Sequence, residues 1–186
     1  MSHTHSGVCV RRLEREDLPA AIAIQSETYP EFLRENERAF VSRLKVKASY
    51  CLAAMQDGAL VAYLLAHGWP RQAPPAIGTV LPADAPSEVL FIHDLAVSSA
   101  GRGLGLGRML VSCAFKLASR DGLEAAELIA VAGAASYWRK FGFLEAAASA
   151  GLAGKVAAYG PEARWMRHEI VLGPSKPLSA APAQER

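Results

Sequence analysis

A glycine-rich run, GRGLGLGRML from Gly101 to Leu110, constrains the fold of this chain more than any other feature. It directly follows the apolar stretch Val89–Val97, and apolar residues recur at helical spacing from Leu106 onward. Glycines at a strand-to-helix junction permit a tight turn because they have no Cβ. The unpaired N–H groups at a helix start, with the positive end of the helix dipole, then attract an anion such as phosphate. The run therefore predicts a strand, a phosphate-binding turn and a helix.

Two common phosphate-binding motifs do not fit this run. A P-loop needs Gly-Lys followed by Ser or Thr, and that triplet occurs nowhere in the chain. A dinucleotide fingerprint needs G-x-G-x-x-G early in a βαβ unit, whereas these glycines are Gly103, Gly105 and Gly107, past the middle of the chain. The pattern Arg102-x-x-Gly105-x-Gly107 remains, and its alternative is a glycine-rich helix start that binds no ligand.

Length and composition favour one soluble domain. The chain has 186 residues, of which 51% are hydrophobic and 20% charged, which is enough to bury a core. The net charge of +2 favours neither nucleic acid nor a membrane surface as a partner. No apolar run approaches the ~18 residues of a membrane span and no signal-peptide core follows Met1, so we expect a cytoplasmic protein.

The three cysteines, Cys9, Cys51 and Cys113, are odd in number and far apart. They have no metal-ligand spacing, so no metal site is predicted. We interpret all three as small core hydrophobes of a protein in a reducing compartment.

Periodicity and turn signals predict the elements before the glycines. Asp17-Leu18-Pro19 is typical of a helix start, and Asp57-Gly58 is a strong hairpin signal. The expected second helix has Phe32, Phe40 and Leu44 facing inward. The expected elements are a strand at 8–13, a helix from Asp17, a helix at 31–47, strands at 50–56 and 60–66, and a proline-rich loop at 69–87.

The elements expected from the apolar stretch onward are a strand at 89–97, a helix at 106–120, a strand at 125–131, a helix at 134–141, a strand within 144–159 and a strand at 165–172. The last residues, 173–186, have the composition of a disordered tail. This gives a single domain over 1–172.

Two further segments accompany Arg102-x-x-Gly105-x-Gly107, and together the three resemble the GNAT superfamily of N-acetyltransferases. FIHDLAV at 91–97 resembles the family's strand ending in Leu-x-Val, and SYWRKFGF at 136–143 resembles its Y-x-K-x-G-F signature. The resemblance covers about 8–172. It implies the acyl-CoA N-acyltransferase fold, a mixed α/β (α+β) architecture. Its central mixed, mostly antiparallel sheet is splayed at the cofactor cleft and has helices on both faces.

The same resemblance implies acetyl-CoA as the cosubstrate. Its pantetheine arm would add strand-like hydrogen bonds to the sheet edge. Trp138 would form a wall of the acyl pocket, with core packing as the alternative. The implied cofactor-binding residues are Leu95, Ala96 and Val97 for pantetheine, and Arg102, Gly103, Leu104, Gly105, Leu106, Gly107 and Arg108 for the pyrophosphate.

His93 is the candidate base. An alkylamine with a pKa of about 10.4 must lose a proton before it attacks a thioester, and histidine is the side chain that titrates near neutrality. The segment His93-Asp94-Leu95-Ala96-Val97 resembles the serotonin (arylalkylamine) N-acetyltransferase branch and its bacterial relatives. That resemblance implies that the matching histidine belongs to a proton relay. A buried histidine with satisfied hydrogen bonds is the alternative of equal weight.

The general acid departs from the family pattern. Trp138 stands where the family often has a catalytic tyrosine, and its indole N–H is not acidic. Tyr137 is the candidate substitute, although adjacent helix residues point about 100° apart. A water molecule, or departure of the thiolate unaided, are the other possibilities.

The acceptor side is predicted from the elements that cover the substrate mouth in this fold. Glu27 would pair with an ammonium group, while Tyr29 or Trp69 would stack on it. The leading hypothesis is transfer of acetyl to the primary amine of a small molecule by direct attack in a ternary complex. An acyl-CoA-binding sensor and a protein or peptide lysine acetyltransferase are the alternatives, and a homodimer is compatible with each.

Overall fold

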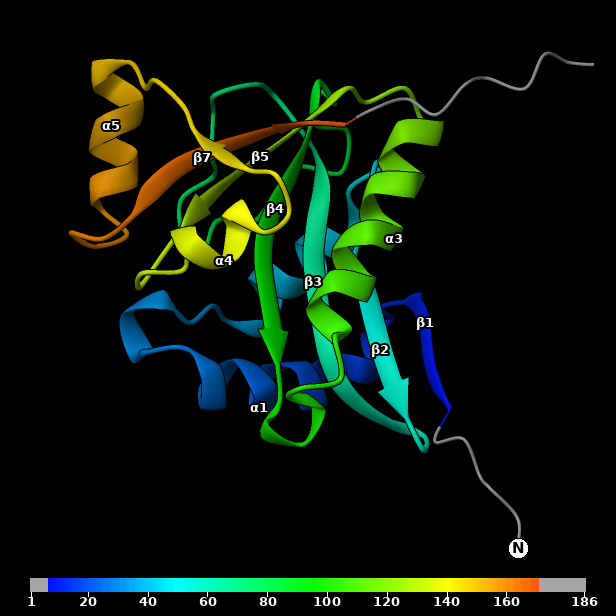
Figure 1. The fold of residues 1–186 in the computed structure, drawn as a ribbon. Coiled ribbons are helices and arrows are strands. Elements are labelled where there is room, and N and C mark those ends of the chain that lie inside the picture. Colours follow the sequence, from blue (N-terminus) through cyan, green and yellow to red (C-terminus); the bar gives the residue numbers. More distant parts are fainter. Residues whose placement is uncertain (1–6, 171–186) are drawn as a thin grey trace, which may run out of the picture.

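The computed structural model describes residues 7–170, so the tail predicted at 173–186 lies outside the described residues. A seven-stranded sheet forms the centre of the molecule, with strand order β1-β2-β3-β4-β5-β7-β6 (Figure 1). All neighbouring strands are antiparallel except β4 and β5, which are parallel. The strands are β1 (Val8–Arg12), β2 (Leu52–Gln56), β3 (Ala59–Trp69), β4 (Val89–Val97), β5 (Ala125–Ala130), β6 (Leu144–Glu145) and β7 (Arg164–Glu169).

Helices cover both faces of the sheet, as expected. On one face α3 packs its apolar side against the strands, with Leu106 and Leu110 fully buried. On the other face α1 and α2 pack against Tyr63 and Leu65 of β3, and Figure 1 shows α1 on the side of the sheet away from α3. The helices are α1 (Leu18–Thr28), α2 (Glu37–Lys45), α3 (Leu106–Arg120), α4 (Ala135–Arg139) and α5 (Ala150–Ala157), with 3-10 turns at η1 (Arg15–Asp17), η2 (Glu31–Leu33) and η3 (Ser99–Gly101).

The sheet opens between its two parallel strands. β4 pairs with β5 only from Leu90 to Ile92, and its last five residues have no partner on that side. The splayed sheet that the family resemblance implies is therefore present, and the gap opens at the end of β4 that leads to the glycine loop.

A β-bulge in β4 decides which way its polar residues point. Against β3, Asp94 pairs with Leu65 and Ile92 pairs with Ala66, so His93 is an extra residue without a partner. One inserted residue breaks the alternation of a strand. His93 and Asp94 consequently both face α1 and α2, where they contact Arg43 and Tyr63, while Ile92 and Leu95 pack on the α3 side.

Local sequence signals located several elements correctly. β4 and α3 have the predicted bounds. Asp57 and Gly58 have φ of 50° and 81°, which two-residue hairpin turns of this kind require. α1 begins after Asp17, but the Asp17 carboxylate does not cap it. The Asp17 carboxylate instead accepts from the Arg11 guanidinium at 2.7 Å and from the Glu14 N–H.

Three predictions were wrong in detail, and one segment contains more than its predicted strand. The helix expected at 31–47 is interrupted, because Asn36 caps a new helix by accepting from the Ala39 N–H. Phe32 is 64% exposed rather than inward, since it lies in the preceding 3-10 turn. Cys9 is exposed on the edge strand β1, so it is not a core residue. Segment 144–159 contains a two-residue strand and also α5, which begins where Ser149 accepts from the Leu152 N–H.

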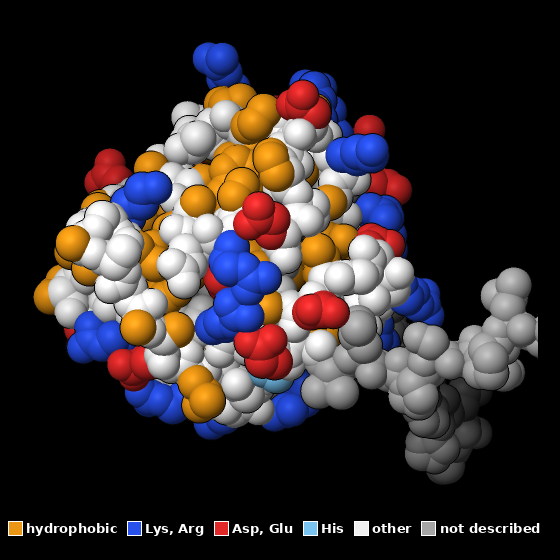
Figure 2. Space-filling view, turned by 90° about the horizontal axis from the view of Figure 1, so that it is seen from above, with side chains coloured by type: hydrophobic (Ala, Val, Ile, Leu, Met, Phe, Trp, Pro, Cys, Tyr) orange, Lys and Arg blue, Asp and Glu red, His pale blue; other side chains and the backbone are white. Residues whose placement is uncertain are grey.

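Two surface properties bear on function. Among residues 7–170, no helix is long and apolar enough to cross a membrane. Figure 2 shows Lys and Arg side chains interspersed with Asp and Glu over the face seen from above. That face offers no uniform basic surface of the kind that binds nucleic acid.

Candidate functional site: a glycine loop and a cavity between β4 and β5

The turn before α3 has the backbone that its glycines predict. Gly105 occupies the N-cap position with φ of +70°, and Gly103 has φ of +80°. Side chains other than glycine rarely adopt this region. No atom lies within 4 Å of where a Cβ would stand at either glycine, so the space in front of the loop is open.

The start of α3 is suited to an anion. Its first turn contains no acidic residue and includes the exposed Arg108. The backbone N–H groups of that turn have no carbonyl partner within the helix and point into the open space. Leu106 is buried in the core, so it can serve a ligand only through its backbone. A pyrophosphate fits this loop by charge and by backbone geometry.

A cavity of about 350 Å³ lies beside this loop, where β4 and β5 diverge. Leu95, Val97, Tyr137 and Trp138 line its end near α3. Its other end reaches α1, the residues before α2, the proline-rich loop and the residues after α5. The lining there is Gln25, Thr28, Tyr29, Pro30, Leu33, Glu35, Ile77, Phe91, His93, Asp94 and Tyr159. Most of the residues that line this second end are apolar or uncharged, and the charged side chains among them are few.

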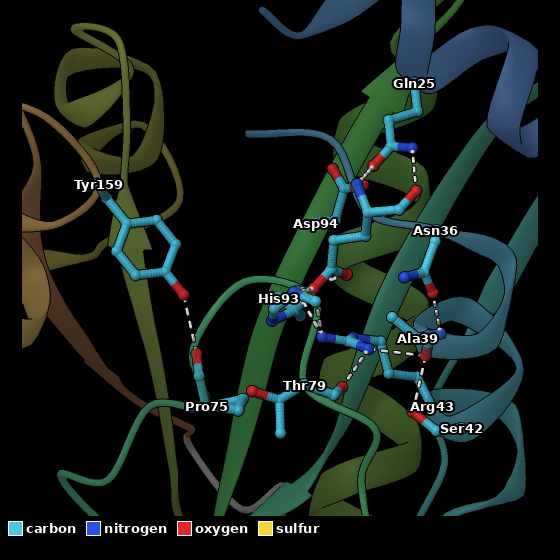
Figure 3. A network of polar contacts seen from close by, with 12 residues as sticks. Gln25, Asn36, Ala39, Ser42, Arg43, Pro75, Thr79, His93, Asp94 and Tyr159 are labelled. Carbon is cyan, nitrogen blue, oxygen red and sulfur yellow. Dashed lines mark hydrogen bonds and ion pairs between the residues drawn. The ribbon is translucent and has the colours of Figure 1, made fainter. Parts of the chain in front are cut away.

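Glu35, Arg43 and His93 form a buried polar cluster at the second end (Figure 3). Glu35 Oε1 accepts from Arg43 Nη2 at 2.7 Å and from the Gly78 N–H at 2.5 Å. Glu35 Oε2 lies 2.9 Å from Nε2 of His93. Gln25 holds the backbone of Glu35 in place, since its amide both donates to and accepts from that residue.

The ring nitrogen Nε2 of His93 has one hydrogen-bond donor and one acceptor as neighbours. Nε2 lies 2.9 Å from both Glu35 Oε2 and Arg43 Nη2. The carboxylate only accepts hydrogen bonds and the guanidinium only donates them, so one nitrogen cannot satisfy both. When Nε2 carries the proton it donates to Glu35, and Nδ1 then has a free lone pair. Among the described residues Nδ1 has no hydrogen-bond partner, and His93 lines the cavity.

Glu35 is ionised although it is buried. Burial acts most strongly and raises its pKa, but the neighbouring His93 and Arg43 and the Gly78 N–H outweigh it. The pKa of Glu35 is therefore lowered overall, and the carboxylate is ionised near neutral pH. It can orient His93 and stabilise the imidazolium that forms when Nδ1 takes a proton.

Asp94 is the second carboxyl group at this end of the cavity. Its Oδ2 accepts from the Tyr63 hydroxyl at 2.5 Å, while Oδ1 is buried with no hydrogen-bond partner in the described part of the chain. Burial raises the pKa of Asp94 more than the Tyr63 hydrogen bond lowers it. The nearby Tyr29 hydroxyl donates to the Leu95 carbonyl at 2.9 Å.

The proline-rich loop closes the second end of the cavity and is bound from both sides. Near Arg43, the loop offers the Gly78 N–H to Glu35 and the Thr79 carbonyl to Arg43 Nη1 at 3.2 Å. From the opposite side, the Tyr159 hydroxyl donates to the Pro75 carbonyl at 2.8 Å (Figure 3). The loop is thus a fixed wall of the cavity.

The structure brings six of the predicted site residues together around the cavity. His93, Tyr29, Leu95, Val97, Tyr137 and Trp138 all line the cavity. Tyr137 is about one-third exposed and packs on Trp138 with ring centroids 5.4 Å apart. A Cβ on Gly107 would stand 2.1 Å from the Tyr137 hydroxyl, so Tyr137 lies against the start of α3.

The predicted residues 102–108 form the turn before α3 and its first residues and do not line the cavity, and three further predicted residues lie outside both. Glu27 is exposed on α1 and Trp69 donates its indole N–H to the Ala73 carbonyl at 2.6 Å, and neither lines the cavity. Ala96 is buried on the α1 side of the sheet and is also absent from the lining. Its backbone remains on the unpaired end of β4.

Glu35, Arg43, Asp94 and Tyr159 are polar residues of the site that sequence reasoning did not select. Glu35 and Arg43 stand in a charged segment that resembles a solvated helix face. Arg43 is nevertheless 0% exposed. A signal for Asp94 was present, since a carboxylate interrupts an apolar strand beside His93.

Comparisons with known proteins agree with this geometry. The family model described as "Acetyltransferase (GNAT) family" matches residues 11–143. No curated protein matches the chain by sequence.

Several solved structures share its fold. Ard1 from Thermoplasma volcanium is 13% identical with a TM-score of 0.67, covering 88% of this chain and 98% of that one. The ribosomal-protein-S18-alanine N-acetyltransferase from Escherichia coli is 19% identical with a TM-score of 0.64, covering 91% and 98%. The GNAT family N-acetyltransferase YhbS from Escherichia coli, in complex with CoA, is 18% identical with a TM-score of 0.60, covering 92% and 86%.

The family model spans well over half of the chain, and the splayed sheet and glycine loop suit the same cosubstrate. The chain therefore belongs to the acetyltransferase (GNAT) family, as an acyltransferase that uses acetyl-CoA.

Proposed function

We propose that this enzyme transfers the acetyl group of acetyl-CoA to the primary amine of a small molecule, by direct attack in a ternary complex. The observation that carries the proposal is the placement of His93. Its Nε2 lies against the buried Glu35, and its ring lines the cavity whose other end is lined by Tyr137, the residue that lies against the start of α3.

His93 is the residue to which we assign the general base. An amine enters mainly as ammonium, because its pKa of about 10.4 is far above neutral pH. With Nε2–H donating to Glu35, Nδ1 can accept the proton that the amine loses. Glu35 then stabilises the imidazolium, as a carboxylate does for histidine bases in general.

Tyr137 is the residue to which we assign protonation of the leaving thiolate. It lines the cavity and its hydroxyl lies against Gly107 at the start of α3. Burial raises the pKa of Tyr137, partly offset by Arg108, so the hydroxyl keeps its proton near neutral pH. Trp138 lines the same wall but has no acidic hydroxyl.

The glycine loop would bind the pyrophosphate through the N–H groups of Gly105, Leu106, Gly107 and Arg108, with Arg102 and the preceding Gly103 and Leu104 in the same exposed turn. The unpaired end of β4, residues 93–97, would hydrogen-bond the pantetheine arm. These assignments extend the family's binding mode to the residues of this chain.

The proline-rich loop beside the acceptor end favours a small molecule over a polypeptide. The proline-rich loop is tied to Glu35 and Arg43 by its residues 78 and 79, and to Tyr159 by residue 75. A peptide acceptor needs an open groove for its backbone on both sides of the reacting amine. A loop bound on both sides of the cavity leaves room for a compact amine.

Acetyl-CoA consumption, measured as free thiol, tests the proposal against a panel of alkylamines, arylalkylamines, polyamines, amino acids and a lysine peptide. CoA binding is measured by calorimetry on the same sample. We expect turnover of at least one small amine and none of the peptide. Tight CoA binding without turnover of any acceptor would favour a sensor, and turnover of the peptide alone would overturn the small-molecule assignment.

A further inference from the structure

The ring of Tyr137 is held in place by two aromatic side chains. Its centroid lies 5.4 Å from that of Trp138, with the two rings nearly perpendicular, and 5.0 Å from that of Phe141. Trp138 is buried and packs in turn on Phe141 and Phe143. Among residues 7–170 the Tyr137 hydroxyl has no hydrogen-bond partner. Packing therefore determines where this hydroxyl lies.

The hydroxyl occupies the space that a side chain at position 107 would fill. Gly107 is the second residue of α3, and a Cβ built on it would stand 2.1 Å from the Tyr137 hydroxyl oxygen. Cβ atoms do not approach other atoms more closely than 3.0 Å. The next neighbours of this Cβ, Leu95 Cδ2 and Tyr137 Cζ, both lie at 3.5 Å, which is an ordinary contact. Only the hydroxyl is therefore incompatible with a methyl group at this position.

The backbone gives no other reason for a glycine at position 107. Gly103 and Gly105 have positive φ, whereas Gly107 lies inside α3 and does not. Alanine is more favourable than glycine within a helix. A Cβ at Gly105 would meet open space, but one at Gly107 would point toward Leu95 and Tyr137. The missing side chain at Gly107 thus leaves room for Tyr137.

The start of α3 suits a tyrosine that gives up its proton. A phenol that loses its proton becomes a phenolate, which the positive end of a helix dipole stabilises. The first turn of α3 contains no acidic residue. Burial raises the pKa of Tyr137, and the charge of Arg108 acts in the opposite direction, in favour of the phenolate. The side chain of Tyr137 also lines the cavity.

We propose that Gly107 is a positioning residue, whose missing side chain lets the Tyr137 hydroxyl lie against the start of α3 and donate its proton to the CoA thiolate. The O–H bond breaks, an S–H bond forms, and the phenolate regains a proton from solvent, since Tyr137 is about one-third exposed. The inference rests on the proposed function, which assigns the acid to Tyr137. It explains how the neighbour of Trp138 reaches that role.

A double-mutant cycle of Gly107→Ala and Tyr137→Phe tests the pairing, with an amine accepted in the panel above. Each single variant should lower kcat about 100-fold, as loss of a general acid does. The double variant should be no worse than Tyr137→Phe, because phenylalanine has no hydroxyl for the new Cβ to displace. Losses that multiply in the double variant would overturn the inference. A native kcat in Gly107→Ala beside an impaired Tyr137→Phe would overturn it as well.

Calorimetry with CoA separates positioning from cosubstrate binding. All three variants should bind CoA within about threefold of the native protein, since the backbone N–H groups of α3 remain. Gly154→Ala is the matched control, because Gly154 lies within α5 and a Cβ there meets no atom within 4 Å. Its kcat should equal that of the native protein. Weakened CoA binding in Gly107→Ala would mean that the methyl group obstructs the cosubstrate, and would overturn the inference.

NMR of protein with 13C-labelled tyrosine rings reports the position of Tyr137 without turnover. The Tyr137 signal is the one that Tyr137→Phe removes. We expect it to shift in Gly107→Ala and to stay in place in Gly154→Ala. A shift together with a native kcat in Tyr137→Phe would keep the positioning by Gly107 and reject Tyr137 as the acid of the proposed function. An unshifted signal in Gly107→Ala would overturn the inference itself.

Discussion

The chemistry of the acceptor end depends on single residues that are far apart in the sequence. Glu35 and His93 are separated by 58 positions and meet at 2.9 Å, and Arg43 completes the cluster. Removing one member of a buried, hydrogen-bonded charge pair leaves the other uncompensated. Substitutions here should therefore be conservative in shape, so that a change in activity can be separated from a loss of folding.

Glu35→Gln should lower kcat about 100-fold, because an amide orients His93 less strongly and does not stabilise its imidazolium. The affinity for CoA should not change, since Glu35 lies at the opposite end of the cavity from α3. The pH dependence of kcat should shift as well. Steady-state kinetics across pH, with calorimetry for CoA, makes the comparison. A variant with the wild-type profile would show that Glu35 does not act through His93.

His67 should make the protein less stable in mild acid. Burial, chiefly, lowers its pKa to about 3 from 6.5, so between these values the unfolded chain binds a proton that the folded chain does not. Stability therefore falls as pH drops through this window. At pH 5 the loss should be about 2 kcal/mol.

Urea unfolding of the protein and of His67→Asn at pH 7 and pH 5 measures this effect. Other groups titrate in both proteins, so the difference between them isolates His67. The variant should lose less stability than the native chain between the two pH values. Equal losses would mean that His67 is protonated in the folded state.

At the scale of elements, the turn before α3 combines a left-handed N-cap with open space. A Cβ at Gly105 meets no atom within 4 Å, so a side chain there would extend into the predicted pyrophosphate site. Gly122, which follows the other end of α3, has a similar φ of +84° and similarly open surroundings. The two glycines make a matched pair for testing the loop.

Gly105→Glu should weaken acetyl-CoA binding about 100-fold, since a carboxylate at the helix start repels phosphate. Gly122→Glu should share the backbone strain, about 1–2 kcal/mol, without loss of affinity. Calorimetry measures the affinity for acetyl-CoA, and thermal unfolding measures the loss of stability that the backbone strain causes. The loop would lose its assignment if both variants bound acetyl-CoA as the native protein does.

At the scale of the whole molecule, the cavity is closed by segments from different parts of the chain. The proline-rich loop contacts α2 through Arg43 and the residues after α5 through Tyr159. The hydrogen bond from Tyr159 to Pro75 joins residues that are 84 positions apart in the sequence. Closure of the acceptor end is thus a property of the assembled fold and of no single element.

Tyr159→Phe should loosen this closure by removing one hydrogen bond, worth about 1 kcal/mol. KM for small amines should rise several-fold, and limited proteolysis should cut the loop at 70–88 more readily. Tyr50→Phe removes a comparable hydroxyl, which binds Asp121 at 2.8 Å, and is the matched control. Indistinguishable KM values and cleavage rates in the two variants would contradict a role for Tyr159 in closing the cavity.

The sequence by itself determined the family, the glycine turn before α3 and the bounds of β4 and α3. These depend on local rules: apolar periodicity, and glycines where φ is positive. Only the tertiary structure decided which charged residues form the site. The bulge at His93 reverses the side on which Asp94 lies, and the capped break at Asn36 places Glu35 inside. Burial and pairing of charges are long-range properties, since each contact joins segments whose own patterns indicate nothing about the other.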